Sequence, residues 1–308
     1  MDISYMTLLG SEIKMLLPVA LGFTAAKIGI LNEKFSRELS RLLLNMLLPF
    51  YIFSAVCSVD RTQSSLKEIG TVALISLAAH ALAAAVAFLT SVRKKGRDVK
   101  GIVRSCTIFR NMGFFGIPLL SDVFGAKGAF WAAINVVVYN VLFWTFGVFI
   151  FSRAGGNTKF EAKKVLLNPG IITCVIGLAV FFSGFHIYQP VMDAVNVIGD
   201  ACTPISMILI GGILARLSFK ELVSSLPVYH TALISLAVTP VVCMLVFRAV
   251  GLSAEYVALG TLIIALPSAS NNVAIAERDG VNPKLTAEIV GVTVVLTLVT
   301  VPLISFLF

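Results

Sequence analysis

The chain has 308 residues, of which 58% are hydrophobic and only 13% are charged, and its mean hydropathy is +0.95. In soluble domains about half of the residues are apolar and about a quarter are charged, so this composition excludes an ordinary soluble domain and predicts a polytopic membrane protein. The net charge of +8 does not indicate nucleic-acid binding, because the basic residues fall in short loops between long apolar runs.

Ten apolar runs are long enough to cross the roughly 30 Å of bilayer hydrocarbon. We therefore predict an all-α membrane protein that forms one transmembrane domain over residues 1–308, with no cofactor. The five cysteines are scattered singly, so neither a disulfide framework nor a metal site is expected. The ten predicted spans are 8–30, 39–59, 69–92, 102–123, 128–151, 165–185, 191–215, 227–250, 255–276 and 285–307.

Lysine and arginine are distributed unevenly between the two sides of this ten-span topology. One side collects 17 of them and the other side 4. By the positive-inside rule the side with 17 is cytoplasmic, which predicts a cell-membrane protein with both termini outside. Binding of anionic lipid by the basic loops stays open as an alternative. The 17 are Lys34, Arg37, Arg41, Arg93, Lys94, Lys95, Arg97, Lys100, Arg104, Arg153, Lys159, Lys163, Lys164, Arg216, Lys220, Arg278 and Lys284, and the 4 are Arg61, Lys67, Lys127 and Arg248.

The chain also contains a weak internal repeat. A shift of 155 residues brings Pro49 onto Pro204, Gly125 onto Gly280, and each predicted span onto the span five places later. Each half holds an odd number of spans, so the two halves must cross the membrane in opposite senses. This predicts an inverted repeat of residues 1–153 and 156–308.

Two apolar spans are interrupted near their centres, the fourth at residues 109–118 and the ninth at residues 265–272. Proline, glycine and small polar side chains in these stretches free backbone hydrogen-bonding groups, which a bilayer tolerates only where they are buried in protein or line a watery cavity. Paired breaks in two halves of a chain indicate the substrate site of a transporter.

Each broken span would consist of two half-helices, with new helix N-termini after Gly113 and after Ser270. Such ends present unpaired N–H groups and a positive dipole end, and so attract anions. In an alternative interpretation the polar side chains only cap the broken helices. The predicted substrate-binding residues are Asn111, Gly113, Pro118, Pro267, Ser268, Ser270, Asn271, Asn272 and the adjoining Arg110.

Charged or titratable side chains inside the spans are candidates for function because each is costly at depth. Asp200 lies deep in the seventh span, where the other half of the repeat has the neutral Asn45. We predict a coupling or ion site there, with Asp200 as proton carrier, cation ligand or ion partner of Arg110. His80 in the third span is expected to be a packed, hydrogen-bonded histidine rather than a proton relay.

The motifs at the two breaks resemble those of the auxin efflux carrier family in its bacterial form, within the superfamily that includes the bile acid:sodium symporters. The resemblance rests on Asn111-x-Gly113-x-x-Gly116-x-Pro118-Leu119 and on Pro267-Ser268-Ala269. It implies a scaffold of spans 1, 2, 6 and 7, a transport unit of spans 3–5 and 8–10, spans 4 and 9 that cross at their breaks, elevator-type motion, and homodimers formed through the scaffold.

Two departures from the family pattern remove auxin as an implied substrate. Only residues 152–164 join the fifth and sixth spans, whereas the plant carriers have a long cytoplasmic loop there. Met112 and Gly113 stand where those carriers have a proline and a second asparagine.

We therefore predict a secondary transporter of small organic anions, either mono- or dicarboxylates, whose partners are its substrate, the bilayer and a second copy of the chain. A sodium-coupled symporter of the bile-acid type is the alternative, followed by an anion channel. An enzyme is not expected, because the sequence contains no HExxH or GxSxG motif and no paired aspartate-rich motif.

Overall fold

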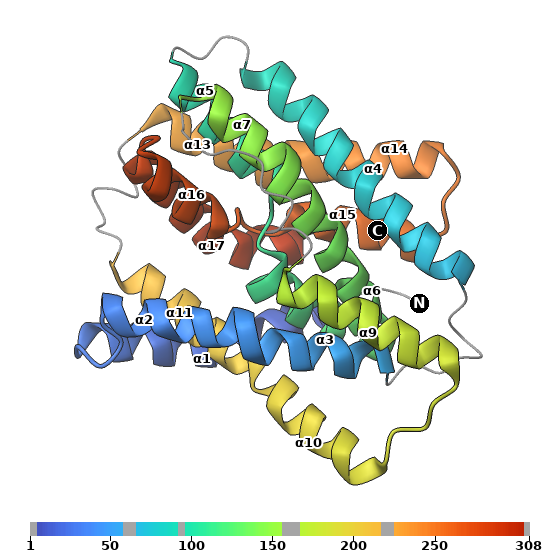
Figure 1. Cartoon of the computed structure of the whole chain (residues 1–308). Coiled ribbons are helices and arrows are strands. Elements are labelled where there is room, and N and C mark those ends of the chain that lie inside the picture. Colours follow the sequence, from blue (N-terminus) through green and yellow to red (C-terminus); the bar gives the residue numbers. More distant parts are fainter. Residues whose placement is uncertain (1–4, 58–65, 92–95, 156–166, 217–224, 305–308) are drawn as a thin grey trace.

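The computed structural model of the chain describes residues 5–57, 66–91, 96–155, 167–216 and 225–304 (Figure 1). Within these ranges every regular element is a helix, and extended backbone pairs only at one isolated bridge between Arg110 and Ser268. The predicted all-α class is confirmed for this part of the chain.

The helices follow the predicted apolar runs, and several runs contain consecutive helices joined by a π-helical turn or a break. In chain order they are α1 (Tyr5–Lys27), α2 (Glu33–Leu42), η1 (Leu43–Leu47), α3 (Leu48–Cys57), α4 (Leu66–Ser91), α5 (Arg97–Ile108), η2 (Met112–Gly116), α6 (Ile117–Leu142), η3 (Phe143–Gly147), α7 (Val148–Arg153), α9 (Pro169–Ser183), α10 (Gln189–Asp200), α11 (Cys202–Arg216), α13 (Leu226–Leu233), η4 (Ile234–Val238), α14 (Thr239–Ala249), α15 (Ala254–Ala265), α16 (Asn271–Asp279) and α17 (Pro283–Ile304).

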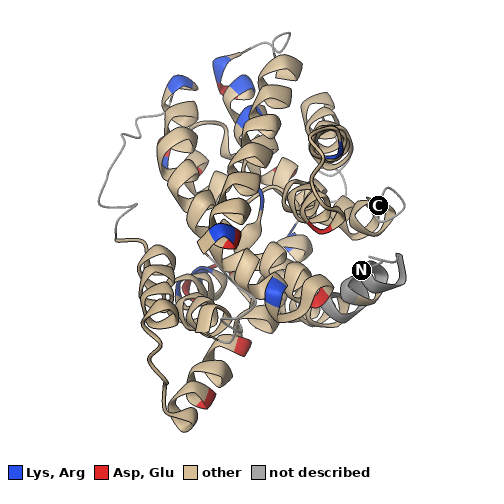
Figure 2. Cartoon of the chain, turned by 90° about the vertical axis from the view of Figure 1, so that its right-hand side faces the viewer, with Lys and Arg blue, Asp and Glu red and all other residues tan. Residues whose placement is uncertain are grey.

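Several of these helices are suited to a bilayer, which makes this a multi-pass membrane protein. Figure 2 shows long stretches of ribbon that carry no charged residue. By length and composition six helical runs in the described residues can cross a membrane, whereas some other predicted spans contain only shorter helices. Ten crossings therefore stay a prediction. The six runs are Glu33–Cys57, Leu66–Ser91, Met112–Arg153, Gln189–Arg216, Leu226–Ala249 and Pro283–Ile304.

Several helices begin at an asparagine, and two of these starts are followed by proline. Asn168 Oδ1 accepts hydrogen bonds from the backbone N of Gly170 at 3.0 Å, and Asn282 Oδ1 accepts one from the N of Leu285 at 3.3 Å. Both asparagines are helix caps, and the proline that follows each one occupies a first-turn position where no N–H is needed. The starts of α9 and α17 are therefore encoded locally.

Glycines with positive φ recur at the spacing predicted for the repeat. The pairs 29 and 184 (φ 83° and 79°), 96 and 251 (89° and 81°), and 125 and 280 (63° and 67°) are each separated by 155 residues. A side chain rarely adopts this left-handed conformation, so glycine is the residue that fits these chain reversals. At Gly125 the reversal is a kink inside α6, which separates the predicted fourth and fifth spans.

The helices form two groups, as Figure 1 shows. The lower group contains α1, α2, α3, α9, α10 and α11, and the upper group contains α4, α5 and α13 to α17. Within the lower group α1 and α11 approach closely, because a Cβ atom at Gly22 or Gly211 would overlap the backbone of Ile208 or Val19. Helix α6 packs against members of both groups.

Polar contacts connect α6, and the π-helical turn η2 that precedes it, to the lower group. Asn168 Nδ2 donates to Asn140 Oδ1 at 3.1 Å, and Ser206 Oγ donates to the carbonyl O of Phe114 at 3.1 Å. The broken helix therefore lies at the boundary between the groups.

Candidate functional site

The two predicted breaks lie side by side and pair with each other. Asn111 N donates to the carbonyl O of Pro267 at 2.8 Å, and Ala269 N donates to the carbonyl O of Phe109 at 3.0 Å. These bonds form the antiparallel bridge at Arg110 and Ser268. Backbone groups freed by one break are thus satisfied by the other, which is how a non-helical segment can persist inside an apolar protein.

The second half of each broken helix begins at this crossing. Helix η2 starts at Met112, and its cap Asn111 accepts a hydrogen bond through Oδ1 from Phe114 N at 3.1 Å. The predicted start after Gly113 is therefore wrong by two residues. Pro118 lies in the first turn of α6 rather than in the break, because its missing N–H costs nothing there. Helix α16 starts directly after Ser270, as predicted.

Two of the predicted binding residues form hydrogen bonds with the protein itself, so their side chains do not face the cavity. Ser268 and Asn272 are both 0% exposed. Ser268 Oγ donates to Cys106 O at 2.7 Å, and Asn272 Oδ1 accepts from Ser105 Oγ at 2.6 Å. These side chains fasten the second break to α5. The carbonyl O of Pro267 accepts the hydrogen bond from Asn111 N. Pro267, Ser268 and Asn272 therefore fit the alternative interpretation, in which these residues support the broken helices rather than bind the substrate.

The other predicted residues at the breaks meet at a cavity of about 340 Å³. The N-termini of both half-helices open onto it, through Asn111 and Gly113 on one side and Ser270 and Asn271 on the other. Its lining contains three arginines and no Asp or Glu. The remaining lining residues are Arg37, Ser40, Arg41, Leu44, Asn45, Leu48, Arg110, Met112, Phe114, Val136, Tyr139, Asn140, Trp144, Asn168, Pro169 and Ala269.

Sequence reasoning missed the polar residues that α6 and the start of α9 add to this cavity. Tyr139 accepts a hydrogen bond at Oη from Asn271 Nδ2 at 3.3 Å, and Asn140 is held by Asn168. The signal that could have found Asn140 is the presence of two amides, Asn135 and Asn140, in the middle of an apolar span.

A second cavity of about 510 Å³ adjoins the first and shares Arg37, Ser40, Ser270 and Asn271 with it. It extends to the side chains of Arg216 and Lys284, which belong to the side predicted to be cytoplasmic. Glu33, Glu277 and Glu288 line it as well, so this second cavity carries both signs of charge.

Arg110 has a buried guanidinium, and the residue is 1% exposed. Its Nη2 donates to the carbonyl O of Ser235 in η4 at 2.8 Å, whereas Nε and Nη1 have no hydrogen-bond partner among the described residues. Asp200 is exposed at the end of α10 in the lower group. The ion pair considered between Arg110 and Asp200 is not formed, because the guanidinium is directed to the upper group.

Asn45, which the repeat aligns with Asp200, lines the cavity from η1. Its Nδ2 donates to the carbonyl O of Arg41 at 2.8 Å. A coupling or ion site at Asn45 and Asp200 stays a prediction. Among the described residues, no group of three or more His, Cys, Asp or Glu side chains could hold a metal ion.

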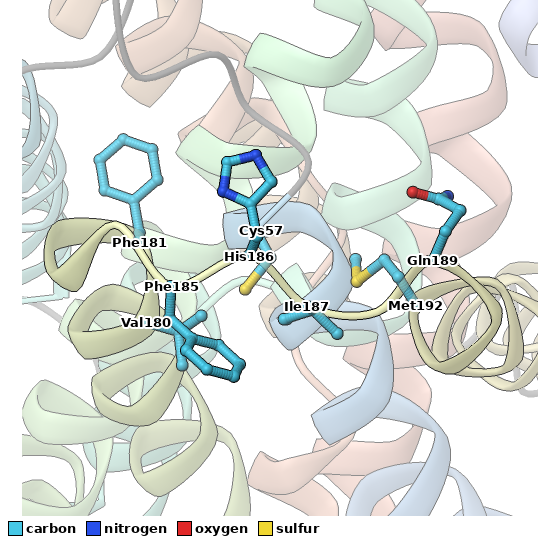
Figure 3. Close-up of a pocket in the computed structure, with 8 residues that line it drawn as sticks. All are labelled: Cys57, Val180, Phe181, Phe185, His186, Ile187, Gln189 and Met192. Carbon is cyan, nitrogen blue, oxygen red and sulfur yellow. The ribbon is translucent and has the colours of Figure 1, made fainter.

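Another pocket, of about 280 Å³, lies on the lower group (Figure 3). It contains none of the residues of the breaks and no charged side chain, so the crossing is the better candidate site. Its lining residues are Cys57, Val180, Phe181, Phe185, His186, Ile187, Gln189 and Met192.

Comparison with known proteins agrees with this arrangement. A family model described as membrane transport protein matches residues 8–305, which is nearly the whole chain. The chain belongs to the membrane transport protein family. This is the family of the auxin efflux carriers, so the resemblance seen in the break motifs is confirmed.

Relatives of the same length are also transporters. An uncharacterized transporter of Methanothermobacter thermautotrophicus is 24% identical over 305 residues, covering 94% of this chain and 95% of that protein. The uncharacterized transporter YfdV of Shigella flexneri is 22% identical over 308 residues, covering 96% of each. A Rhizobium meliloti protein named "Putative malonate transporter" is 23% identical over 204 residues, covering 63% of this chain and 62% of that protein.

Proposed function

We propose that this membrane transport protein is a secondary transporter of small organic anions, and that the anion binds where the two broken helices cross. The observation that carries the proposal is the cavity of about 340 Å³, onto which two helix N-termini open and whose lining has three arginines and no acidic residue. Helix N-termini and arginines both favour an anion, and a pocket without carboxylates does not repel one.

Carboxylates are the substrate class that fits this cavity best. Its volume lies near the lower end of the roughly 300–1,000 Å³ of ligand pockets, which suits a small molecule. Arg37 and Arg41 are one turn apart on α2 and line the cavity, and each also forms an exposed ion pair, with Glu33 at 3.4 Å and with Glu38 at 3.3 Å. A monocarboxylate would occupy the helix ends alone, and a dicarboxylate would also reach one of these arginines. The relative named for malonate supports the dicarboxylate.

We further propose the inverted repeat and the elevator motion expected for this family. Three glycine pairs with positive φ at a spacing of 155 residues support the repeat. The lower group of helices corresponds to the scaffold and the upper group, with α6, to the transport unit. In the same proposal the protein lies in the cell membrane as a dimer formed through the scaffold, with both termini outside.

The test is counterflow of radiolabelled malonate into proteoliposomes, together with malonate binding by the purified protein. Asn111→Leu and Asn271→Leu each remove an amide from the cavity, a loss of about 1–3 kcal/mol if the ligand stays unpaired. Malonate affinity is therefore expected to fall roughly 5- to 150-fold. Asn196→Leu is the matched control, because Asn196 lies on α10 and bonds Ser54 away from the cavity.

Two results would contradict the proposal. If a well-folded Asn111→Leu, Asn271→Leu double variant binds malonate with unchanged affinity, both amides only cap their helices and do not bind the substrate. Ohmic single-channel currents without saturation or counterflow would favour a channel instead.

A further inference from the structure

His80 on α4 is a buried titratable group directly behind the candidate site. It is 3% exposed, and its Nδ1 lies 2.8 Å from the carbonyl O of Ser76. A carbonyl oxygen can only accept, so Nδ1 carries the hydrogen. Nε2 is buried and has no hydrogen-bond partner among the described residues. In the neutral imidazole this nitrogen is therefore a bare acceptor, an arrangement that folded proteins usually avoid.

The imidazole touches the residues that form the crossing. Its ring centroid is 6.5 Å from that of Phe109, whose carbonyl accepts the bond from the second break, and 6.5 Å from that of Tyr139. Tyr139 lines the cavity and accepts a hydrogen bond from Asn271. Tyr139 thus contacts the imidazole ring and also lines the cavity of the proposed anion.

The charge that acts on His80 among the described residues is that of Arg110, which follows Phe109. Tyr139 on α6 is a titratable neighbour of the imidazole, and Cys106 on α5 interacts with Arg110. Helices α14 and α15 also pack against α4. Their charged residues lie at helix ends, with Arg248 exposed in the last turn of α14 and Glu255 in the first turn of α15.

We propose that His80 binds the proton that accompanies the anion through the membrane, so that the protein works as an anion–proton symporter. This inference rests on the proposed anion site. With the cavity empty, a proton on Nε2 would place a second positive charge near Arg110, which is unfavourable in a buried site. An anion at the crossing offsets both charges, so each ligand raises the affinity for the other.

This linkage is what a symporter requires. The empty carrier does not hold the proton, and the carrier with anion bound does, so neither is expected to cross without the other. No covalent step is involved: Nε2 takes a proton from water on one side and releases it on the other. The chemistry differs from that of Asp200, which is exposed and remote from the crossing.

The first experiment counts protons taken up on binding. Malonate is titrated into the purified protein at pH 7.5, where malonate itself is fully ionised, in two buffers of different ionisation enthalpy. The expected uptake is close to one proton per malonate in the wild type and none in His80→Gln, which can still donate to Ser76. His186→Gln, at an exposed histidine, is the matched control and should behave as the wild type.

The second experiment uses proteoliposomes with a pH gradient. Wild-type affinity for malonate should fall about tenfold per pH unit above neutrality, the slope expected for one linked proton, and stay flat in His80→Gln. That variant should keep malonate counterflow but lose accumulation driven by the gradient. If it does not fold, His80→Met, which removes the acceptor at similar volume, replaces it.

Binding of malonate by the wild type without proton uptake would overturn the role of His80 and leave anion transport standing. Unchanged proton uptake in His80→Gln would do the same. If the wild type binds neither malonate nor any other carboxylate, the proposed function fails and the proton site fails with it.

Discussion

Arg110 lines the cavity as a buried cation, and its Nε and Nη1 have no hydrogen-bond partner among the described residues. Its hydrogen bond to Ser235 joins the first break to η4, and a guanidinium in a low-dielectric interior is costly without an acid beside it. An anion that binds nearby would offset this cost, because it attracts the positive charge of the guanidinium. We therefore expect Arg110 to act on the substrate through its field, from behind the break, rather than by contact.

Arg110→Gln tests this distinction, because glutamine removes the charge but can still donate to the carbonyl of Ser235. At an effective dielectric constant of about 20, a unit charge is worth roughly 1–2 kcal/mol over about 8–15 Å. Affinity should therefore fall roughly 5- to 30-fold. That range applies to the monoanion acetate; the free energy lost for the malonate dianion should be about twice as large, because the field acts on both of its charges, as measured by binding to the purified variant.

Asp200→Asn alone should leave both affinities unchanged, because Asp200 is exposed and does not pair with Arg110 in this structure. Loss of malonate binding with acetate binding unchanged in Arg110→Gln would show that the guanidinium contacts a second carboxylate. Rescue of that variant by Asp200→Asn would show that the two side chains pair in another state of the transport cycle.

The sequence identified which stretches form the site but not which side chains face the substrate. Ser270 and Asn271 line the cavity, whereas Ser268 and Asn272 face α5 and are 0% exposed. All four are small polar residues within five positions of one another. Their directions depend on the backbone pairing with the other break, which no local pattern encodes.

At the scale of elements, the breaks are stabilised by each other rather than by their own sequences. Proline and glycine predicted that the helices would be interrupted, and this is correct. The predicted interruption, residues 109–118, extended too far, because Pro118 lies in the first turn of α6. A proline is as compatible with the first turn of a helix as with a break. The bonds from Asn111 N to Pro267 O and from Ala269 N to Phe109 O hold the chain extended directly after α5 ends at Ile108.

The contact between α1 and α11 depends on glycine, and this gives a prediction about stability. A Cβ atom at Gly211 would overlap the backbone of Val19, and overpacking of this kind costs about 1–3 kcal/mol. Gly211→Ala should therefore lower the melting temperature of the purified protein.

Gly70→Ala is the matched control, since Gly70 also lies within a helix but has nothing within 4 Å of its Cβ position. It should leave the melting temperature unchanged or raise it, because alanine favours a helix by about 1 kcal/mol over glycine. Equal melting temperatures for the two variants would mean that α1 and α11 can separate at no cost.

At the scale of the whole molecule, both cavities at the crossing reach toward basic residues of one side. The larger cavity is lined by Arg37, Arg216 and Lys284 together with Glu33, Glu277 and Glu288, and the charge bias predicts a cytoplasmic location for its three basic residues. This supports a state that is open to the cytoplasm. The termini lie outside the described residues, so their predicted outer location stays a prediction.

An elevator requires that the two groups of helices slide past each other, and the polar contacts between them identify where to stop that motion. Asn140 on α6 and Asn168 before α9 join the two groups at 3.1 Å, whereas Ser54 on α3 and Asn196 on α10 form a 2.6 Å contact within the lower group. Disulfide crosslinks at these two places should therefore have opposite effects on transport.

In a background without native cysteines, oxidation of the double variant Asn140→Cys, Asn168→Cys should abolish malonate counterflow in proteoliposomes, and a reductant should restore it. The crosslinked protein should still bind malonate. Any loss of affinity caused by the two substitutions themselves is measured in the reduced sample of the same variant. Oxidised Ser54→Cys, Asn196→Cys should transport normally, because its crosslink lies inside one rigid group. Transport that continues at full rate in the fully crosslinked first variant would mean that the crossing opens to both sides without relative movement of the groups.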